Sequence, residues 1–245
     1  MFSSFPKVRP PLSDAFAAIY ETQYRENRGG KTPAYSAAAK MESWLHRRVA
    51  DDVRRDRSPR TTLEIGAGTL NQLPYEPPVG PYDIVEPFTG LFEGSPMRPR
   101  IRHVYSDTTE VPPRQRYDRI TSVAVFEHIC NLPEVVARTG LLLHEAGTLR
   151  VSIPSEGTWL WRLGWKMTTG LEFRWRYGLD YGVLMAYEHV NTAAEIEEVL
   201  RYFYDDVRVE VFGLSRGISF YRFYECAKPG RSRCDTYLRE ISARS

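Results

Sequence analysis

The chain alternates between short apolar runs and longer stretches in which apolar residues recur at helical spacing. Short runs rich in β-branched residues and bounded by turn residues are typical of strands buried within a sheet. The runs lie at residues 61–65, 81–87, 101–105, 117–125, 148–153, 207–211 and 220–226. The last run is apolar on both faces, which suits a strand inserted within the sheet. The pattern predicts seven strands with helices between them.

Two helices are predicted before the first strand, over residues 12–57. Phe16, Tyr20 and Tyr24 recur at helical spacing in the first of them. Gly29-Gly30 then breaks the pattern, which predicts a turn between the two helices. The second helix has a single apolar stripe, which is typical of a helix that covers one side of a sheet. This stripe consists of Ala38, Met41, Leu45, Val49 and Val53.

Further helices are predicted between the later strands. One begins at residues 132–134, with proline at a first-turn position, and ends at Gly147. Another begins at Thr192, which forms a capping box with Glu195, and precedes the sixth strand. Residues after Pro229 are basic and polar, which predicts a loose or weakly helical tail.

The stretch Thr61–Asn71, reading TTLEIGAGTLN, joins the first strand to a glycine turn. Gly66 and Gly68 remove side chains where the strand turns, so that the backbone can lie against a ligand, usually a nucleotide. The next strand ends at Glu86, about 20 residues past Gly66. An acid at this distance, at the carboxyl edge of an open α/β sheet, typically accepts hydrogen bonds from ribose hydroxyls. The two features together predict a nucleotide-containing ligand.

With these motifs the chain resembles the class I S-adenosylmethionine (SAM) dependent methyltransferases, in particular small-molecule enzymes of the ubiquinone-biosynthesis type. Their first motif is an acid followed by alternating glycines, matched by Glu64, Gly66 and Gly68. Leu70 replaces the frequent third glycine. Asn71 stands where a nicotinamide-binding fingerprint needs glycine, which disfavours a dehydrogenase.

The resemblance implies which residues would contact SAM. In this family an acid after the third strand caps the adenine amino group, a role that carries over to Asp107; an Asx turn is the structural alternative. Val123 stands where relatives often have polar residues, so a contact there would come from the backbone. The implied cofactor-binding residues are Glu64, Gly66, Ala67, Gly68, Glu86, Pro87, Asp107, Thr108 and Val123.

Two histidines are candidates for catalysis. Methyl transfer to a hydroxyl needs in-line positioning and a base, because a neutral hydroxyl is a poor nucleophile. His128 follows the fourth strand in an EH pair that resembles a signature of the family, where this histidine more often looks structural. His189 is the second candidate, with an ordinary helix-entry role as its alternative. No HxH, HExxH or CxxC spacing indicates a metal site.

Residues 158–187 form an insertion rich in aromatic side chains and cations. Acceptor-binding insertions are common at this point in the family. Aromatic faces and cations suit a sugar ring, a planar ring or a membrane interface beside a lipid-linked acceptor. A local subdomain with its own aromatic core is the alternative. We expect the segment to form the acceptor-side wall of the pocket.

The composition restricts the class of protein. The 245 residues, 42% hydrophobic and 26% charged, are typical of one soluble globular domain. The formal net charge of +2 gives no general attraction to nucleic acid. Three cysteines are too few for a disulfide framework, and a cytoplasmic setting is the simplest. No apolar stretch reaches membrane-spanning length, and residues 1–20 lack the apolar core of a signal peptide.

We therefore expect a single α/β domain with a Rossmann-like, seven-stranded, mostly parallel sheet and helices on both faces. Its parts are a helical cap at residues 12–57, a core at 61–227 and a lid inserted at 158–187, after the fifth strand. The expected function is SAM-dependent methyl transfer to a small-molecule or saccharide-containing acceptor, with oxygen as the target atom. The alternatives are a SAM-binding protein without catalysis and an NAD(P)-dependent oxidoreductase.

Overall fold

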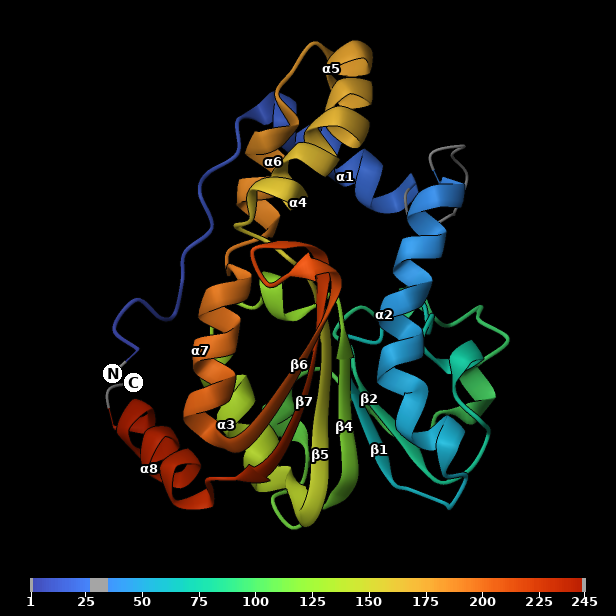
Figure 1. The fold of residues 1–245 in the computed structure, drawn as a ribbon, viewed down its shortest axis with the longest axis vertical. Helices are drawn as coiled ribbons and strands as arrows, with labels where there is room; N and C mark the ends of the chain where they lie inside the picture. Colours follow the sequence, from blue (N-terminus) through green and yellow to red (C-terminus); the bar gives the residue numbers. More distant parts are fainter. Residues whose placement is uncertain (1, 27–34, 244–245) are drawn as a thin grey trace.

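One sheet organises the chain in the computed structural model, which describes residues 2–26 and 35–243, the side chains of 21–41 excepted (Figure 1). The strand order is β3-β2-β1-β4-β5-β7-β6. Strands β1 to β5 are parallel, whereas β7 runs antiparallel between β5 and β6. The predicted sheet and its inserted strand are therefore confirmed. The strands are β1 (Thr62–Ile65), β2 (Tyr82–Val85), β3 (Val104–Tyr105), β4 (Tyr117–Val123), β5 (Leu143–Pro154), β6 (Tyr204–Ser215) and β7 (Ile218–Pro229).

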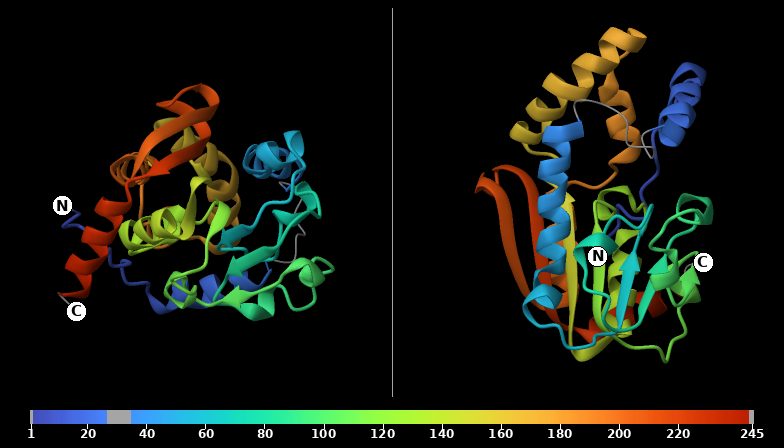
Figure 2. Two further views of the ribbon diagram at one scale, coloured as in Figure 1. Left: turned by 90° about the horizontal axis from the view of Figure 1, so that it is seen from below. Right: turned by 90° about the vertical axis from the view of Figure 1, so that its right-hand side faces the viewer.

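Helices cover both faces of the sheet, as the alternation along β5 shows (Figures 1 and 2). Leu149 and Val151 belong to the apolar core that the sheet shares with α3 (Leu132–Leu142) and α7 (Ala193–Phe203). The intervening Arg150 and Ser152 point to the opposite face, where both side chains donate to backbone carbonyls of α2 (Tyr35–Arg55). The predicted capping box of Thr192 and Glu195 begins α7.

The remaining helices lie beyond the carboxyl ends of the parallel strands, apart from α8 (Arg231–Ser242), which packs against α3. The predicted helical cap consists of α1 (Asp14–Glu26) and α2, and the Gly29-Gly30 break lies outside the described residues. The inserted segment is helical. It comprises α4 (Trp159–Trp165), the π-helical η7 (Lys166–Gly170), α5 (Leu171–Tyr177) and α6 (Tyr181–Glu188). None of the described helices combines the length and the apolar composition needed to cross a bilayer.

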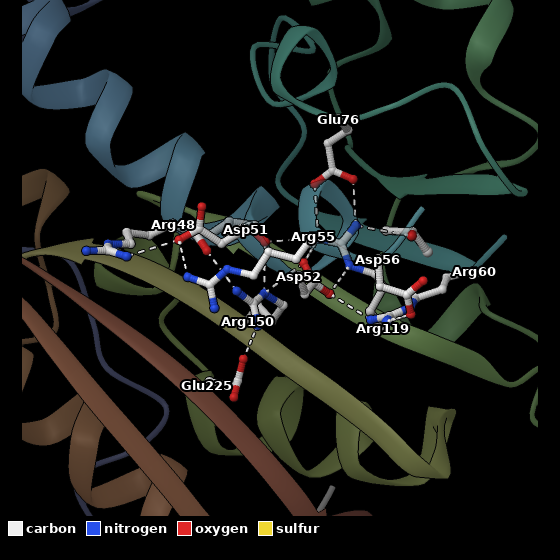
Figure 3. Close-up of polar contacts among 12 residues, drawn as sticks. Arg48, Asp51, Asp52, Arg55, Asp56, Arg60, Glu76, Arg119, Arg150 and Glu225 are labelled. Atoms are coloured by element: carbon white, nitrogen blue, oxygen red, sulfur yellow. Dashed lines mark hydrogen bonds and ion pairs between the residues drawn. The ribbon is translucent and has the colours of Figure 1, made fainter. Parts of the chain in front are cut away.

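The face of the sheet beneath α2 is polar rather than apolar (Figure 3). The fully buried Arg119, on β4, donates to Glu76 Oε2 at 2.5 Å, to Asp52 Oδ2 at 3.0 Å and to the carbonyl of Val49 at 3.0 Å. On the neighbouring strand, Arg150 donates to the same Val49 carbonyl at 2.8 Å. Charged hydrogen bonds therefore hold α2 on the sheet where other parts of the molecule use apolar packing.

Several predicted element boundaries were wrong. The third helix ends at Leu142 and β5 already begins at Leu143, so Gly147 lies within the strand. A Cβ at Gly147 would lie 3.0 Å from the Tyr117 carbonyl oxygen, so two strands approach closely at this glycine. The third and fourth strands are shorter than predicted, with β3 limited to Val104–Tyr105 and β4 ending at Val123.

Of the two alternatives predicted for the tail, loose or weakly helical, the structure shows a helix, α8. Its overall composition is polar, but Cys234, Tyr237 and Leu238 lie at helical spacing and pack against α3 or the core around it. A Cβ at Gly140 would lie 2.6 Å from Cys234 Sγ, so α3 and α8 approach closely at this glycine. The composition concealed the amphipathic period that defines the helix.

We predict that Arg119→Leu strongly destabilises the protein. The substitution leaves the buried carboxylate of Glu76 without its cation, whereas Asp52 still pairs with Arg60 and Arg150. Breaking a buried pair from one side typically costs about 3–5 kcal/mol. Arg60→Leu is the matched control, because Arg60 pairs with Asp52 from a more exposed position and should cost less than about 1 kcal/mol. Urea unfolding measures both, and a small loss for Arg119→Leu would contradict a structural role for the buried ion pairs.

Candidate functional site

An open pocket of about 790 Å³ lies at the carboxyl edge of β1, β2 and β4, a size typical of small-molecule sites. Its walls come from the glycine turn, the ends of β2 and β4, and the loop after β3. His128 also lines the pocket, whereas His189 does not. The structure thus brings together all of the cofactor-binding residues predicted from the sequence: Glu64, Gly66, Ala67, Gly68, Glu86, Pro87, Asp107, Thr108 and Val123.

The glycine turn requires its two glycines for different reasons. Gly66 has a φ of +72°, and a Cβ there would lie 2.4 Å from Val125 Cγ2. Gly68 has a φ of +51°, but a Cβ there would meet nothing within 4 Å. The backbone N–H of Gly68 donates to Glu86 Oε2 at 2.8 Å, which fixes the turn to the end of β2. Gly66 therefore permits close packing against Val125, and Gly68 leaves open space on the pocket side.

Glu86 and Asp107 both combine a structural contact with exposure to the pocket. The second carboxylate oxygen of Glu86 accepts from the N–H of Phe88 at 3.0 Å, which holds the side chain at the strand end. Asp107 accepts from the N–H of Thr109 at 2.8 Å, so the Asx-type turn is present at a residue that also lines the pocket. The structural and the ligand-binding interpretations are compatible at each residue.

Glu64 is an acid held in a neutral form. Its side chain is buried at the end of β1, and Tyr82 Oη donates to its Oε2 at 2.9 Å. Burial raises the pKa of Glu64 to about 8, since a charged carboxylate loses its hydration there. At neutral pH the protonated form therefore dominates.

The end of β4 bends sharply into the pocket. Ala124 adopts a left-handed conformation with a φ of +52°, which is uncommon for a residue with a side chain. Its N–H donates to the carbonyl of Ser152 at 2.7 Å, so the neighbouring strand maintains the bend. Val123 and Ala124 both line the pocket, as the sequence predicted for a stretch that presents its backbone.

The two candidate histidines lie against each other, with ring centroids 4.8 Å apart. His128 Nδ1 contacts the carbonyl of Glu188 at 3.0 Å, and His189 Nδ1 contacts Glu156 Oε2 at 2.7 Å. Burial and the nearby His189 lower the pKa of His128 to about 4. Burial opposes charge on His189 as well, but the hydrogen bond with Glu156 and the carboxylate of Glu127 raise its pKa overall.

The sequence did not reveal the role of Arg9. This residue of the N-terminal leader donates to the carbonyls of Tyr187 at 2.6 Å and His128 at 2.9 Å. It thereby joins the exit of the inserted segment to the turn after β4, and it lines the pocket. No periodicity or motif marks a single arginine in a proline-rich leader. His46, on α2, also lines the pocket and stacks on Tyr75.

The inserted segment supplies little of the pocket wall. Of residues 158–187, Tyr187 lines the pocket. Phe173 is buried, packs against Tyr177 and Tyr181, and stacks on Phe16 of α1 at 6.4 Å. The segment therefore has a small aromatic core of its own, shared with the cap, which was the alternative to a wall made of aromatic side chains.

Comparison with known proteins gives no match in sequence and many in structure. No protein-family model matches the sequence, and no curated protein matches it. A SAM-dependent methyltransferase from Thermotoga maritima is 14% identical and has a TM-score of 0.54, with 86% of this chain and 99% of that chain covered. The plantazolicin methyltransferase BpumL, solved with a substrate analogue and S-adenosylhomocysteine (SAH), is 12% identical with a TM-score of 0.58, covering 86% and 92%.

The chain has the fold of class I SAM-dependent methyltransferases. The N-methyltransferase NodS from Bradyrhizobium japonicum gives a further match with a TM-score of 0.50, at 12% identity over 78% of this chain and 96% of that one. The seven-stranded sheet with one antiparallel strand thus agrees with the methyltransferase fold expected from the glycine turn and the acids after β1 and β2.

We predict that Glu64 makes stability fall as pH rises. The folded state retains a proton on Glu64 between pH 4.5 and about 8, whereas the unfolded state releases it. The stabilisation by this bound proton is therefore complete below pH 4.5 and is lost as pH rises toward 8. Glu64→Gln keeps an acceptor for Tyr82 but cannot ionise, so this part of the pH dependence should disappear. The difference, at most about 4 kcal/mol, is measured by urea unfolding at pH 5 and pH 8. Identical pH dependence in the two proteins would contradict the buried, neutral carboxyl.

Proposed function

We propose that this protein is a SAM-dependent methyltransferase that acts on a small-molecule acceptor. The observation that carries the proposal is the convergence of the glycine turn, Glu86, Asp107 and the bent end of β4 on one pocket. The glycine turn and the two acids are short sequence motifs, and the bend at Ala124 is a feature of the structure. The similarity to solved methyltransferases supports the same conclusion at the level of the fold.

The residues of the pocket fit the parts of SAM. The open side of Gly68 allows the backbone to lie against the ligand, because a side chain there would occupy this space. Glu86 offers carboxylate oxygens to the ribose hydroxyls, and Asp107 offers one to the adenine amino group. SAM supplies an electrophilic methyl group, so the protein must mainly align the acceptor with it.

The acceptor then lies on the side of the pocket formed by His128, Tyr187 and the leader. Tyr187 packs edge-on against Tyr20 at 5.3 Å, and the guanidinium of Arg9 lies 5.2 Å from the Tyr187 ring centroid. An aromatic face beside a cation suits a saccharide or another hydroxylated acceptor. In such an acceptor, the methylated atom is a hydroxyl oxygen. The proton of this hydroxyl leaves on the side of His128 and His189.

We predict that Glu86→Ala weakens SAM binding. Loss of charged hydrogen bonds to the ribose should cost about 1.5–3 kcal/mol, or roughly 10- to 150-fold in Kd. Glu93→Ala is the control, because Glu93 is an exposed acid outside the pocket and should leave Kd unchanged. Calorimetry with both variants checks the ribose role, which an unchanged Kd in a folded Glu86→Ala protein would exclude. Preferential binding of NAD would reject the proposed function, and SAM binding without SAH formation from any acceptor would indicate a non-catalytic binding protein.

The inserted segment supports an acceptor that is lipid-linked. The helix running through α4, η7 and α5 presents five apolar residues, each 43–91% exposed, at intervals of four. On an α-helix, residues four apart are offset by about 40° around the helix axis. The π-helical turn has more residues per turn, so it offsets them in the opposite direction and keeps the row closer to one face. The exposed cations Arg162, Lys166 and Arg174 lie on the same helix. The row, hereafter the apolar row, consists of Trp159, Leu163, Met167, Leu171 and Trp175.

Tryptophans at the ends of an exposed apolar row with interspersed cations are typical of a helix that lies in an anionic membrane surface. This position would bring the acceptor side of the pocket to a lipid headgroup. A membrane surface that covers these five apolar residues explains why the protein itself leaves them exposed.

We predict that the double variant Met167→Ser/Trp175→Ser loses binding to vesicles that contain anionic lipid, by at least about 10-fold in partition coefficient. The substitutions remove apolar area that only the membrane would cover, so the melting temperature should not change. Val8→Ser is the control, since Val8 is 90% exposed but lies outside the apolar row. Sedimentation with vesicles measures the partition, and absence of wild-type binding would reject the lipid-linked acceptor while leaving SAM binding unaffected.

A further inference from the structure

Glu127, His128 and His189 form a compact cluster beside the pocket. One ligand atom from each of the three side chains lies within 4.8 Å of those of the other two. Glu127 and His128 belong to η6 (Phe126–His128), directly after the bend at the end of β4, and His189 ends α6 about 60 residues later. The fold therefore assembles two imidazoles and one carboxylate that no short sequence spacing reveals.

The contacts of the two rings determine which nitrogens are available. His128 Nδ1 faces the Glu188 carbonyl and His189 Nδ1 faces the Glu156 carboxylate. A carbonyl or a carboxylate only accepts hydrogen bonds, so both Nδ1 atoms carry the hydrogen. In a neutral imidazole the other nitrogen, Nε2, then carries a lone pair. Metal-bound histidines usually donate their other ring N–H to a carbonyl or a carboxylate, which fixes the orientation of the ring. The Glu188 carbonyl and the Glu156 carboxylate hold the two rings in the same way.

Glu127 is the third electron-pair donor of the cluster. Its side chain is 1% exposed, and its Oε2 has no hydrogen-bond partner among the described residues. The distance from its Oε1 to His128 Nε2 is 3.8 Å, which is too long for a hydrogen bond. A buried carboxylate without a partner is costly. A cation at the centre of the cluster would remove that cost.

We propose that Glu127, His128 and His189 bind a divalent first-row transition-metal ion. Two histidines and one carboxylate form a facial ligand set that leaves further coordination positions open. His128 lines the pocket, so these positions face the acceptor side. Ligands at about 2.0–2.2 Å from one ion lie about 3.0–3.5 Å apart, so the ligand atoms farthest apart approach each other by up to about 1.5 Å on binding. Imidazole ligands favour Zn²⁺, Fe²⁺ or Ni²⁺ over Mg²⁺, which prefers oxygen.

The role of the ion rests on the proposed function, whereas its binding does not. A hydroxyl of the acceptor at an open coordination position has a lowered pKa and releases its proton to solvent. Its oxygen forms a bond to the SAM methyl carbon as the carbon–sulfur bond breaks, and the electron pair returns to sulfur to give SAH. His128 and His189 are then metal ligands rather than the bases expected from the sequence.

Metal titration of the full-length protein, stripped of metal by a chelator, tests the proposal. Calorimetry with Zn²⁺ should show one saturable site per chain, and Co²⁺ should give the visible absorption bands of a nitrogen-ligated ion. His189→Ala and Glu127→Gln should each weaken Zn²⁺ binding at least about 100-fold, and Glu156→Ala about 10- to 100-fold by releasing the His189 ring. His144→Ala is the matched control, because His144 is exposed and distant in sequence from the cluster.

The outcomes separate this proposal from the proposed function. No saturable Zn²⁺ or Co²⁺ site in the wild-type protein overturns the metal site, as does equal affinity in folded Glu127→Gln and His189→Ala. A loss of affinity in His144→Ala that matches the loss in His189→Ala also overturns it, since binding would then be non-specific. SAM binding is measured on the same samples. Metal binding without SAM binding supports the site and rejects the methyltransferase, and the reverse result rejects only the site.

Discussion

The buried cation of Arg119 is the constraint on which the shape of the pocket depends. A guanidinium with no access to water needs several acceptors, and Arg119 finds them on α2 at Asp52 and Val49 and on the loop after the glycine turn at Glu76. These bonds fix both the rotation and the height of α2 above β4. About one turn before Val49 on the same helix, His46 lines the pocket. The buried polar interface therefore positions a wall of the site.

The cofactor side of the pocket could be predicted from sequence because its residues lie in short, local patterns. The glycines follow one strand and Glu86 ends the next, so strand order alone brings them together. The acceptor side of the pocket could not be predicted from sequence, because its residues come from the leader, the turn after β4 and the exit of the inserted segment. Arg9 and Tyr187 meet through a bond that spans 178 residues, and no local pattern encodes it. Helix α8 is a different case, because its amphipathic period is a local pattern that a polar average composition hides.

The two sides of the pocket also differ in the hydrogen-bond partners of their acidic side chains. On the cofactor side Tyr82 donates to the protonated Glu64, and backbone N–H groups hold Glu86 in place, so each acid has a partner. Beside the pocket, Glu127 has an oxygen without a hydrogen-bond partner among the described residues, next to two rings whose Nδ1 atoms are already engaged. The first arrangement is complete within the protein, whereas the second is the one for which we propose a metal ion.

The leader has a consequence for how the chain folds during synthesis. Lys7 contacts the carbonyl of Val190, and Arg9 contacts the carbonyls of His128 and Glu188. At about 5–20 residues per second, a ribosome needs roughly 10–35 s to pass from Arg9 to the last of these acceptors. The leader must remain undocked through that interval, while the sheet and the inserted segment are made. A segment near the start of the chain thus closes the acceptor side only after the polypeptide has been extended beyond α6.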